Sequence, residues 1–90
     1  MIQIDSINNP LFEKVFIDDL KGIKKLLESL QGFYEKKKRV NGRDGFKRTA
    51  LFYSLYYSSF DTIEYLIANG ADTLFLDFKG RTVLHYAVIL

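Results

Sequence analysis

Residues 70–87 read GADTLFLDFKGRTVLHYA, and the second half of this stretch follows the pattern D-x-x-G-x-T-x-L-H-x-A from Asp77 to Ala87. A related stretch, DGFKRTAL at residues 44–51, aligns with DFKGRTVL at residues 77–84. Self-similarity at a fixed spacing of this size is typical of repeat proteins. In such proteins each repeat is a small unit that buries its apolar face against its neighbours. The sequence therefore predicts a stack of repeats.

The motif resembles the ankyrin repeat, whose T-P-L-H-x-A signature recurs about every 33 residues. The two aligned stretches have this same spacing. TVLHYA at residues 82–87 carries the resemblance most fully, and Gly70-Ala71-Asp72 matches the G-A-D that closes many ankyrin repeats. The resemblance implies an all-α fold, an ankyrin-like stack of antiparallel helix pairs joined by hairpin-like loops. We expect two pairs plus a C-terminal half-repeat, in a single domain over residues 1–90.

The first unit aligns with the second unit at an offset of 40 residues, which is longer than the repeat period of about 33. Seven apolar positions recur at this offset: Leu11, Phe12, Val15, Leu20, Ile23, Leu26 and Leu27 correspond to Leu51, Phe52, Leu55, Phe60, Ile63, Leu66 and Ile67. Because the offset exceeds the period, we expect an insertion near residues 31–43, where Gly32 and Asn41-Gly42 supply turn residues. The expected units are 9–43, 44–76 and 77–90, the last of them incomplete.

Short signals place the ends of the helices. Asn9-Pro10 favours a helix start, since Asn can accept from free N–H groups and Pro suits the first turn. Asp18-Asp19 indicates the start of the second helix, where negative charge is favourable. Thr49 stands at the Thr of the motif, and its hydroxyl is expected to cap the next helix. Gly70 favours the left-handed conformation that ends many helices.

Catalysis and metal binding find little support in the residues. The chain has no Cys and a single His, so a transition-metal site lacks ligands. The resemblance implies a structural role for His85, whose side chain would hydrogen-bond neighbouring loop backbone. Asp44, Asp72 and Asp77 fall at loop positions and are expected to shape turns. We expect no enzyme activity, no cofactor and no metal.

The N-terminus lacks a basic region followed by an apolar run, so we expect no signal peptide. No apolar stretch approaches the roughly 18 residues that a membrane helix needs. We therefore expect a soluble protein with a cytoplasmic location and no membrane partner.

A protein partner is the expected ligand. In ankyrin stacks the hairpin tips and the exposed side of each first helix, on the concave face, bind other proteins. Transferring those positions gives the candidate partner-binding residues Phe16, Phe46, Arg48, Tyr56, Tyr57, Phe78, Lys79 and Arg81. Aromatic and Arg residues on such a surface are typical of interface hot spots. Tyr56 and Tyr57 could instead fill gaps between repeats, since Tyr suits either role.

The basic segment supports a second hypothesis. Between residues 35 and 48 the chain has seven basic and two acidic residues, whereas the remainder has six basic and nine acidic. The candidate residues for binding nucleic acid or another polyanion are Lys36, Lys37, Lys38, Arg39 and Arg43, within a segment that extends to Arg48. A nuclear-import signal or a solvated insertion would have the same composition. We do not expect nucleic acid to be the main partner.

The end of the chain suggests self-association. The apolar residues 87–90 follow a single helix of the third unit, and a repeat unit cannot bury its apolar face alone. Either the chain is part of a longer ankyrin protein, or this end packs against a partner such as a second copy. A third possibility is a truncated remnant without an independent role.

Overall fold

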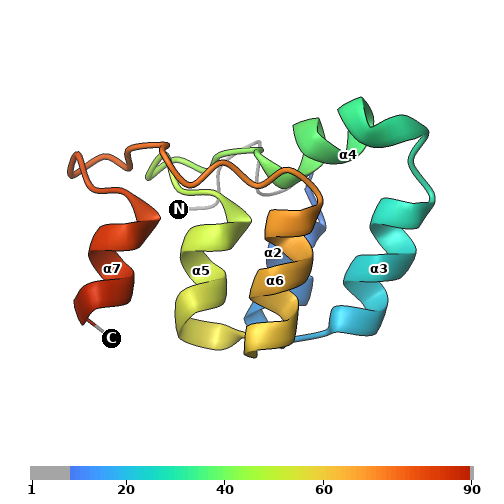
Figure 1. The fold of residues 1–90 in the computed structure, drawn as a ribbon, viewed down its shortest axis with the longest axis horizontal. Helices are drawn as coiled ribbons and strands as arrows, with labels where there is room; N and C mark the ends of the chain where they lie inside the picture. Colours follow the sequence, from blue (N-terminus) through green and yellow to red (C-terminus); the bar gives the residue numbers. More distant parts are fainter. Residues whose placement is uncertain (1–8, 90) are drawn as a thin grey trace.

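The computed structural model describes residues 9–89, and the described residues form helices and loops without strands (Figure 1). The helices are α2 (Leu11–Phe16), α3 (Leu20–Glu28), α4 (Gly32–Val40), α5 (Ala50–Tyr57), α6 (Phe60–Ala68) and α7 (Val83–Ile89). The expected all-α stack is confirmed. Side chains of residues 88–90, which include most of the apolar end, lie outside the described part.

Apart from α4, the helices are arranged as two antiparallel pairs and a final single helix. The pair α2 and α3 is the first unit, the pair α5 and α6 is the second, and α7 begins the third (Figure 1). α5 packs against α2 on one side and α7 on the other. The first helices of the three units therefore lie next to one another, and side chains on them can form a continuous surface.

Helix starts follow the sequence signals in two of three cases. Oδ1 of Asn9 accepts from the amide of Leu11 at 3.2 Å, and Oδ1 of Asp19 accepts from the amide of Gly22 at 2.9 Å. The expected cap from Thr49 is wrong, because its hydroxyl makes no capping hydrogen bond. Gly70 ends α6 with a φ of 95°, as expected.

The core joins the first two units. Its buried apolar residues come from α2, α3, the end of α4, α5, α6 and the start of α7: Leu11, Val15, Ile23, Leu27, Val40, Ala50, Leu51, Leu66 and Val83. Further bonds fix the two units together. The Ser58 hydroxyl donates to the carbonyl of Val15 at 2.8 Å, and the Thr62 hydroxyl donates to Asp18 at 2.7 Å.

The insertion is a helix, which the sequence analysis did not predict. α4 begins at Gly32, with a φ of 78°, and ends before Asn41. Asn41 fixes it to the second unit: its Nδ2 donates to the carbonyl of Gly70 at 2.9 Å, and its Oδ1 accepts from the amide of Asp72 at 2.8 Å. The turn residues therefore bound a helix instead of forming one long loop.

The two hairpin-like loops repeat each other in detail. Asp44 accepts from the amides of Phe46 and Arg48, and Asp77 accepts in the same way from the amides of Lys79 and Arg81. The expected turn-forming role of these two aspartates is confirmed. Nine residues after each aspartate, a tyrosine donates its hydroxyl to that carboxylate: Tyr53 to Asp44 and Tyr86 to Asp77.

Within the described residues, the side of the stack that a following unit would cover is exposed. Leu51 is 1% exposed, whereas Leu84, its counterpart one repeat later, is 66% exposed. Leu27 is fully buried, whereas its counterpart Ile67 is 48% exposed. These pairs differ because the next unit covers the earlier residue, and the described residues supply no second helix to cover the later one.

Candidate partner-binding surface

A row of aromatic rings crosses the three first helices. We define the aromatic row as Phe16 from α2, Tyr57 and Tyr56 from α5, and Tyr86 from α7. Ring centroids lie 5.3 Å apart for Phe16 and Tyr57, 6.4 Å for Tyr57 and Tyr56, and 6.2 Å for Tyr56 and Tyr86. Phe16, Tyr56 and Tyr57 are 44%, 52% and 55% exposed. The row therefore joins the helices and also presents aromatic surface to solvent.

This arrangement answers the question left open for the two tyrosines. Tyr57 contacts Phe16 of the first unit, and Tyr56 contacts Tyr86 of the third. Each therefore occupies the space between repeats while keeping about half of its surface free. The packing role is therefore observed, and the partner-binding role of the two exposed rings stays a prediction.

Arg48 occupies the centre of a cluster between the second and third units. Its Nε donates to Oδ2 of Asp77 at 3.3 Å, and its Nη2 donates to the Tyr86 hydroxyl at 3.1 Å. Four rings surround the guanidinium with centroids 5.4 to 6.0 Å away, those of Phe46, Tyr53, Phe78 and Tyr86. Arg48 is therefore a link between units as well as a surface residue.

Hydrogen bonds within this cluster favour the charged forms of Asp77 and Arg48. Burial alone would raise the pKa of Asp77, but hydrogen bonds from Tyr86, from the amides of Arg81 and Lys79, and from Arg48 lower it to about 2. Burial alone would lower the pKa of Arg48, and its bonds to Tyr86 and Asp77 raise it above the ordinary value. Both groups are charged at neutral pH and already paired.

Tyr53 is held as a neutral phenol. Burial is the largest cause that raises the pKa of Tyr53, and the neighbouring Asp44 carboxylate raises it further. Its hydroxyl is donated to Asp44. The side chain therefore offers a ring face to the surface and no free donor.

The predicted hairpin-tip residues form a second group. The rings of Phe46 and Phe78 lie 5.4 Å apart, and the amide of Phe78 donates to the carbonyl of Phe46 at 2.9 Å. Nζ of Lys79 lies 5.6 Å from the Phe78 ring centroid. Arg81 is half-buried beside this tip. Arg48 contacts Tyr86 of the aromatic row and also Phe46 and Phe78 of the hairpin tips. Most of the predicted partner-binding residues therefore belong to one connected surface, together with Tyr53 and Tyr86.

Three residues of this surface were missed by the sequence analysis, Phe52, Tyr53 and Tyr86. Tyr53 and Tyr86 stand at equivalent positions of successive repeats, and each follows its loop aspartate at the same spacing. That repeated Asp and Tyr spacing was the available signal. Phe52 is buried, and its ring lies 5.7 Å from that of Tyr86.

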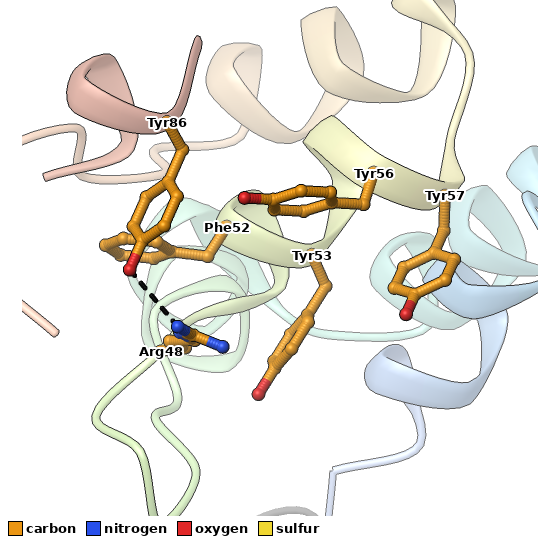
Figure 2. Close-up of a pocket in the computed structure, with 6 residues that line it drawn as sticks. All are labelled: Arg48, Phe52, Tyr53, Tyr56, Tyr57 and Tyr86. Atoms are coloured by element: carbon orange, nitrogen blue, oxygen red, sulfur yellow. Dashed lines mark hydrogen bonds between the residues drawn. The ribbon is translucent and has the colours of Figure 1, made fainter. Parts of the chain in front are cut away.

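A pocket opens where α5 faces α7. It has a volume of about 180 Å³ and is lined by Arg48, Phe52, Tyr53, Tyr56, Tyr57 and Tyr86 (Figure 2). In Figure 2 the guanidinium of Arg48 lies below Tyr86 and Phe52, with Tyr53 to its right and the Tyr56 ring above Tyr53. The pocket belongs to the same surface as the aromatic row.

The basic residues of the second hypothesis are divided between two places. Lys36, Lys37, Lys38 and Arg39 lie on α4, where Lys37, Lys38 and Arg39 occupy the last turn. Cations are favourable at a helix C-terminus. Arg43 is instead part of the loops: its guanidinium donates to the carbonyls of Lys47 and Leu76 and lies 4.9 Å from the Phe75 ring centroid. Four of the five residues therefore lie on α4, and Arg43 lies in the loop that follows it.

His85 differs from the expectation. The imidazole is exposed, and among residues 9–89 its side chain makes no hydrogen bond to loop backbone. Its ring lies 6.1 Å from that of Tyr86. The implied bond is absent because α7 is the last helix of the described stack, and no later loop covers this side of it (Figure 1).

Other functional classes find no support in the described residues. Within residues 9–89 there is no cluster of His, Asp or Glu that could hold a metal ion. None of the described helices is long and apolar enough to cross a membrane.

The fold and this surface define an α-helical repeat protein with an exposed aromatic face, a class whose members present fixed side chains to other molecules. A search of curated proteins found no match. The family model for ankyrin repeats in three copies matches residues 13–90. The chain belongs to the ankyrin-repeat family, whose repeats are generally protein–protein interaction modules and typically non-enzymatic.

Proposed function

We propose that this chain is a non-catalytic interaction module that binds a partner protein through the aromatic row, the Arg48 cluster and the hairpin tips. The observation that carries the proposal is the joined row of rings, in which Phe16 on α2 and Tyr56 and Tyr57 on α5 are about half exposed and the buried Tyr86 on α7 continues the contact. A joined aromatic patch of this kind is typical of interaction sites. Tyr and Arg are also the residue types that contribute most at interfaces.

Binding would rely on rigid display. The rings are held by one another, and the hydroxyls of Tyr53 and Tyr86 are fixed on Asp44 and Asp77. A side chain that is already fixed loses little conformational entropy when a partner covers it. The partner would therefore meet a surface that is largely preorganised.

The test is an affinity capture from nuclease-treated lysate of the source cell. The natural chain is compared with a Phe46→Ala, Tyr56→Ala, Tyr57→Ala triple variant and with a matched control, Phe33→Ala with Tyr34→Ala, which removes exposed rings from α4. A protein retained by the natural chain and the control, and lost by the triple variant, supports the proposal. Retention by the triple variant contradicts it.

A polyanion-binding role for α4 is the second candidate. The observation that favours it is the helix itself, which carries four consecutive basic residues, Lys36 to Arg39, beside the exposed rings of Phe33 and Tyr34. Phosphate contacts together with rings for stacking are what single-stranded nucleic acid requires. Binding through α4 would fall steeply with added salt. It would also be lost when Lys36, Lys37 and Lys38 are changed to Gln.

We also propose that two copies of the chain associate through the exposed side of the last unit, and that the protein is located in the cytoplasm. The exposed residues Phe60, Ile67 and Leu84 are available to a second copy. Sedimentation at increasing concentration tests the first point, with Leu84→Gln expected to reduce association. Imaging of a tagged chain tests the second.

A further inference from the structure

The polar groups inside the pocket of Figure 2 are already paired. The guanidinium of Arg48 donates to Asp77 and Tyr86, and the Tyr53 hydroxyl donates to Asp44. An anionic ligand would have to compete with Asp77 for Arg48. A cationic ligand would lie against Arg48 itself and lose its hydration. The pocket is therefore suited to a neutral, apolar group that needs no hydrogen bond from its floor.

The rim of the pocket has the opposite character. Tyr56 and Tyr57 are half exposed, and within residues 9–89 their hydroxyls have no hydrogen-bond partner. Each hydroxyl can donate to an acceptor on a ligand. A peptide that places an apolar side chain in the pocket would bring its own carbonyls to this rim.

The conformation of such a peptide follows from its free carbonyls. A helical segment uses its carbonyls internally, so it has few to offer the two hydroxyls. A segment that binds as a strand needs the edge of a sheet, and the described residues contain no strand. A polyproline II segment has no internal hydrogen bonds. Its carbonyls are therefore free to accept from Tyr56 and Tyr57.

Proline fits the pocket better than other residues do. Where the backbone of the ligand itself lies against the pocket, any other residue would bring a backbone N–H that requires an acceptor, and the neighbouring carboxylates of Asp44 and Asp77 already accept from Tyr53 and Tyr86. Proline has no N–H to satisfy. Its ring also packs flat against aromatic faces, and its fixed φ reduces the entropy lost on binding. We propose that this pocket binds a proline-containing, extended segment of the partner protein.

The aromatic row indicates the length of that segment. The row crosses α2, α5 and α7, and packed helices lie about 8–10 Å apart, so it extends over about 16–20 Å. A polyproline II chain rises about 3.1 Å per residue, so about five to seven residues would follow the whole row from Tyr86 to Phe16.

This inference rests on the proposed function, and its test uses a defined probe with the natural chain. The probe is a fluorescein-labelled seven-residue peptide, Pro-Pro-Leu-Pro-Pro-Leu-Pro, with three comparison peptides in which the prolines are replaced by Ala, the leucines by Glu, or the leucines by Lys. Fluorescence anisotropy measures each Kd. The proline peptide should bind about tenfold more tightly than each of the others, a difference that corresponds to about 1.4 kcal/mol.

Protein variants locate the binding. Tyr56→Ala should weaken binding of the proline peptide about tenfold, and Tyr56→Phe with Tyr57→Phe about threefold, because the second variant loses the rim donors alone. Leu74→Ala, which removes an exposed apolar side chain outside the proposed sites, is the control and should leave the Kd unchanged. Circular dichroism verifies that each variant is folded.

Two results would overturn the inference. The first is equal affinity for the proline and alanine peptides, and the second is binding of the proline peptide that survives Tyr56→Ala. A captured protein that is lost by the Phe46, Tyr56 and Tyr57 variant, and that the proline peptide does not displace, would support the proposed function and overturn this assignment of its ligand.

Discussion

Nη2 of Arg48 donates a hydrogen bond to the Tyr86 hydroxyl at 3.1 Å, across the boundary between the second and third units. Tyr86 in turn donates to Asp77, which also accepts from Arg48. The three side chains thus form a closed set of bonds between the loop of one repeat and the first helix of the next. Two of the three, Arg48 and Tyr86, also line the pocket, so the residues that stabilise this boundary also shape the candidate surface.

Arg48→Ala should lower the free energy of unfolding by about 1–2 kcal/mol, because the change removes two hydrogen bonds and the packing of the guanidinium among four rings. Asp77 keeps Tyr86 and two backbone amides, so the loss stays moderate. Urea unfolding followed by circular dichroism measures it.

Arg81→Ala is the matched control for Arg48→Ala. Arg81 is the counterpart of Arg48 one repeat later, and no described unit follows it to provide an aspartate and a tyrosine. We expect a change within about 0.5 kcal/mol, as for ordinary surface substitutions. Equal losses for the two variants would show that the bonds across the boundary contribute no stability.

The Asp77 carboxylate should make stability depend on pH in the acid range. Its pKa of about 2 in the folded chain lies below the ordinary value near 3.8. The unfolded chain therefore binds a proton first, so the contribution of Asp77 is fully present above about pH 4 and is lost as the pH falls toward 2. Thermal unfolding between pH 2 and 5 measures the effect.

Asp77→Asn is the comparison that isolates this group. Asp18 also has a lowered pKa, through hydrogen bonds from Thr62 and Ser59, so the natural chain will lose stability for more than one reason. The natural chain should lose more stability than Asp77→Asn over this interval. Parallel curves for the two proteins would contradict the assignment to Asp77.

At two equivalent loop positions, replacing a glycine should lower the free energy of unfolding and introducing a glycine should raise it. Gly80 has a φ of 72°, and Lys47, its counterpart in the previous loop, has a φ of 60°. A side chain in this conformation costs about 1–2 kcal/mol. Gly80→Ala should therefore destabilise the chain by about 1 kcal/mol, since a Cβ there meets no atom within 4 Å and strain alone decides.

Lys47→Gly should stabilise the chain by about 0.5 kcal/mol, because relief of the left-handed strain exceeds the entropy that a glycine loses on folding. Chemical denaturation of the two variants measures both signs. Stabilisation by Gly80→Ala would show that these loops do not hold the observed conformation in solution.

The repeat fold was predictable because its signals are local and periodic. The regular spacing of Asp44 and Asp77 fixes two loops of identical hydrogen bonding, and the apolar positions recur with the helices that bury them. α4 was not predictable in the same way. Its apolar side does not repeat along the chain, and long-range bonds from Asn41 to Gly70 and Asp72 hold it in place.

The sequence predicts which helices and loops form the candidate surface, but it predicts only some of the contacts between the residues on it. Transfer by alignment places Phe16, Tyr56 and Tyr57 on first helices, where the structure also joins them. It could not reveal that Arg48 pairs with Asp77, since that contact depends on how one unit sits on the next. Arg43 was grouped with the basic segment by charge, whereas its partners are loop carbonyls.

Thr49 provides a test of how far this chain departs from its own repeat motif. Thr49 is 1% exposed, and its hydroxyl is the buried side-chain oxygen without a hydrogen-bond partner among the described residues. The motif has His three positions after the Thr, and Phe52 stands there instead. Phe52 packs on Tyr86 and offers no polar atom. The Thr49 hydroxyl therefore loses its hydration without receiving a hydrogen bond.

Thr49→Val should raise the free energy of unfolding by about 1 kcal/mol, because it replaces an unpaired buried hydroxyl with a methyl group of similar size. No cap is lost, since the Thr49 side chain makes no capping bond. Thr82→Val at the equivalent, half-buried position of the third unit is the control and should be neutral or destabilising, because water can reach that hydroxyl. A loss of stability in Thr49→Val would mean that the hydroxyl has a partner in solution, and the structural cost assigned to Phe52 would be wrong.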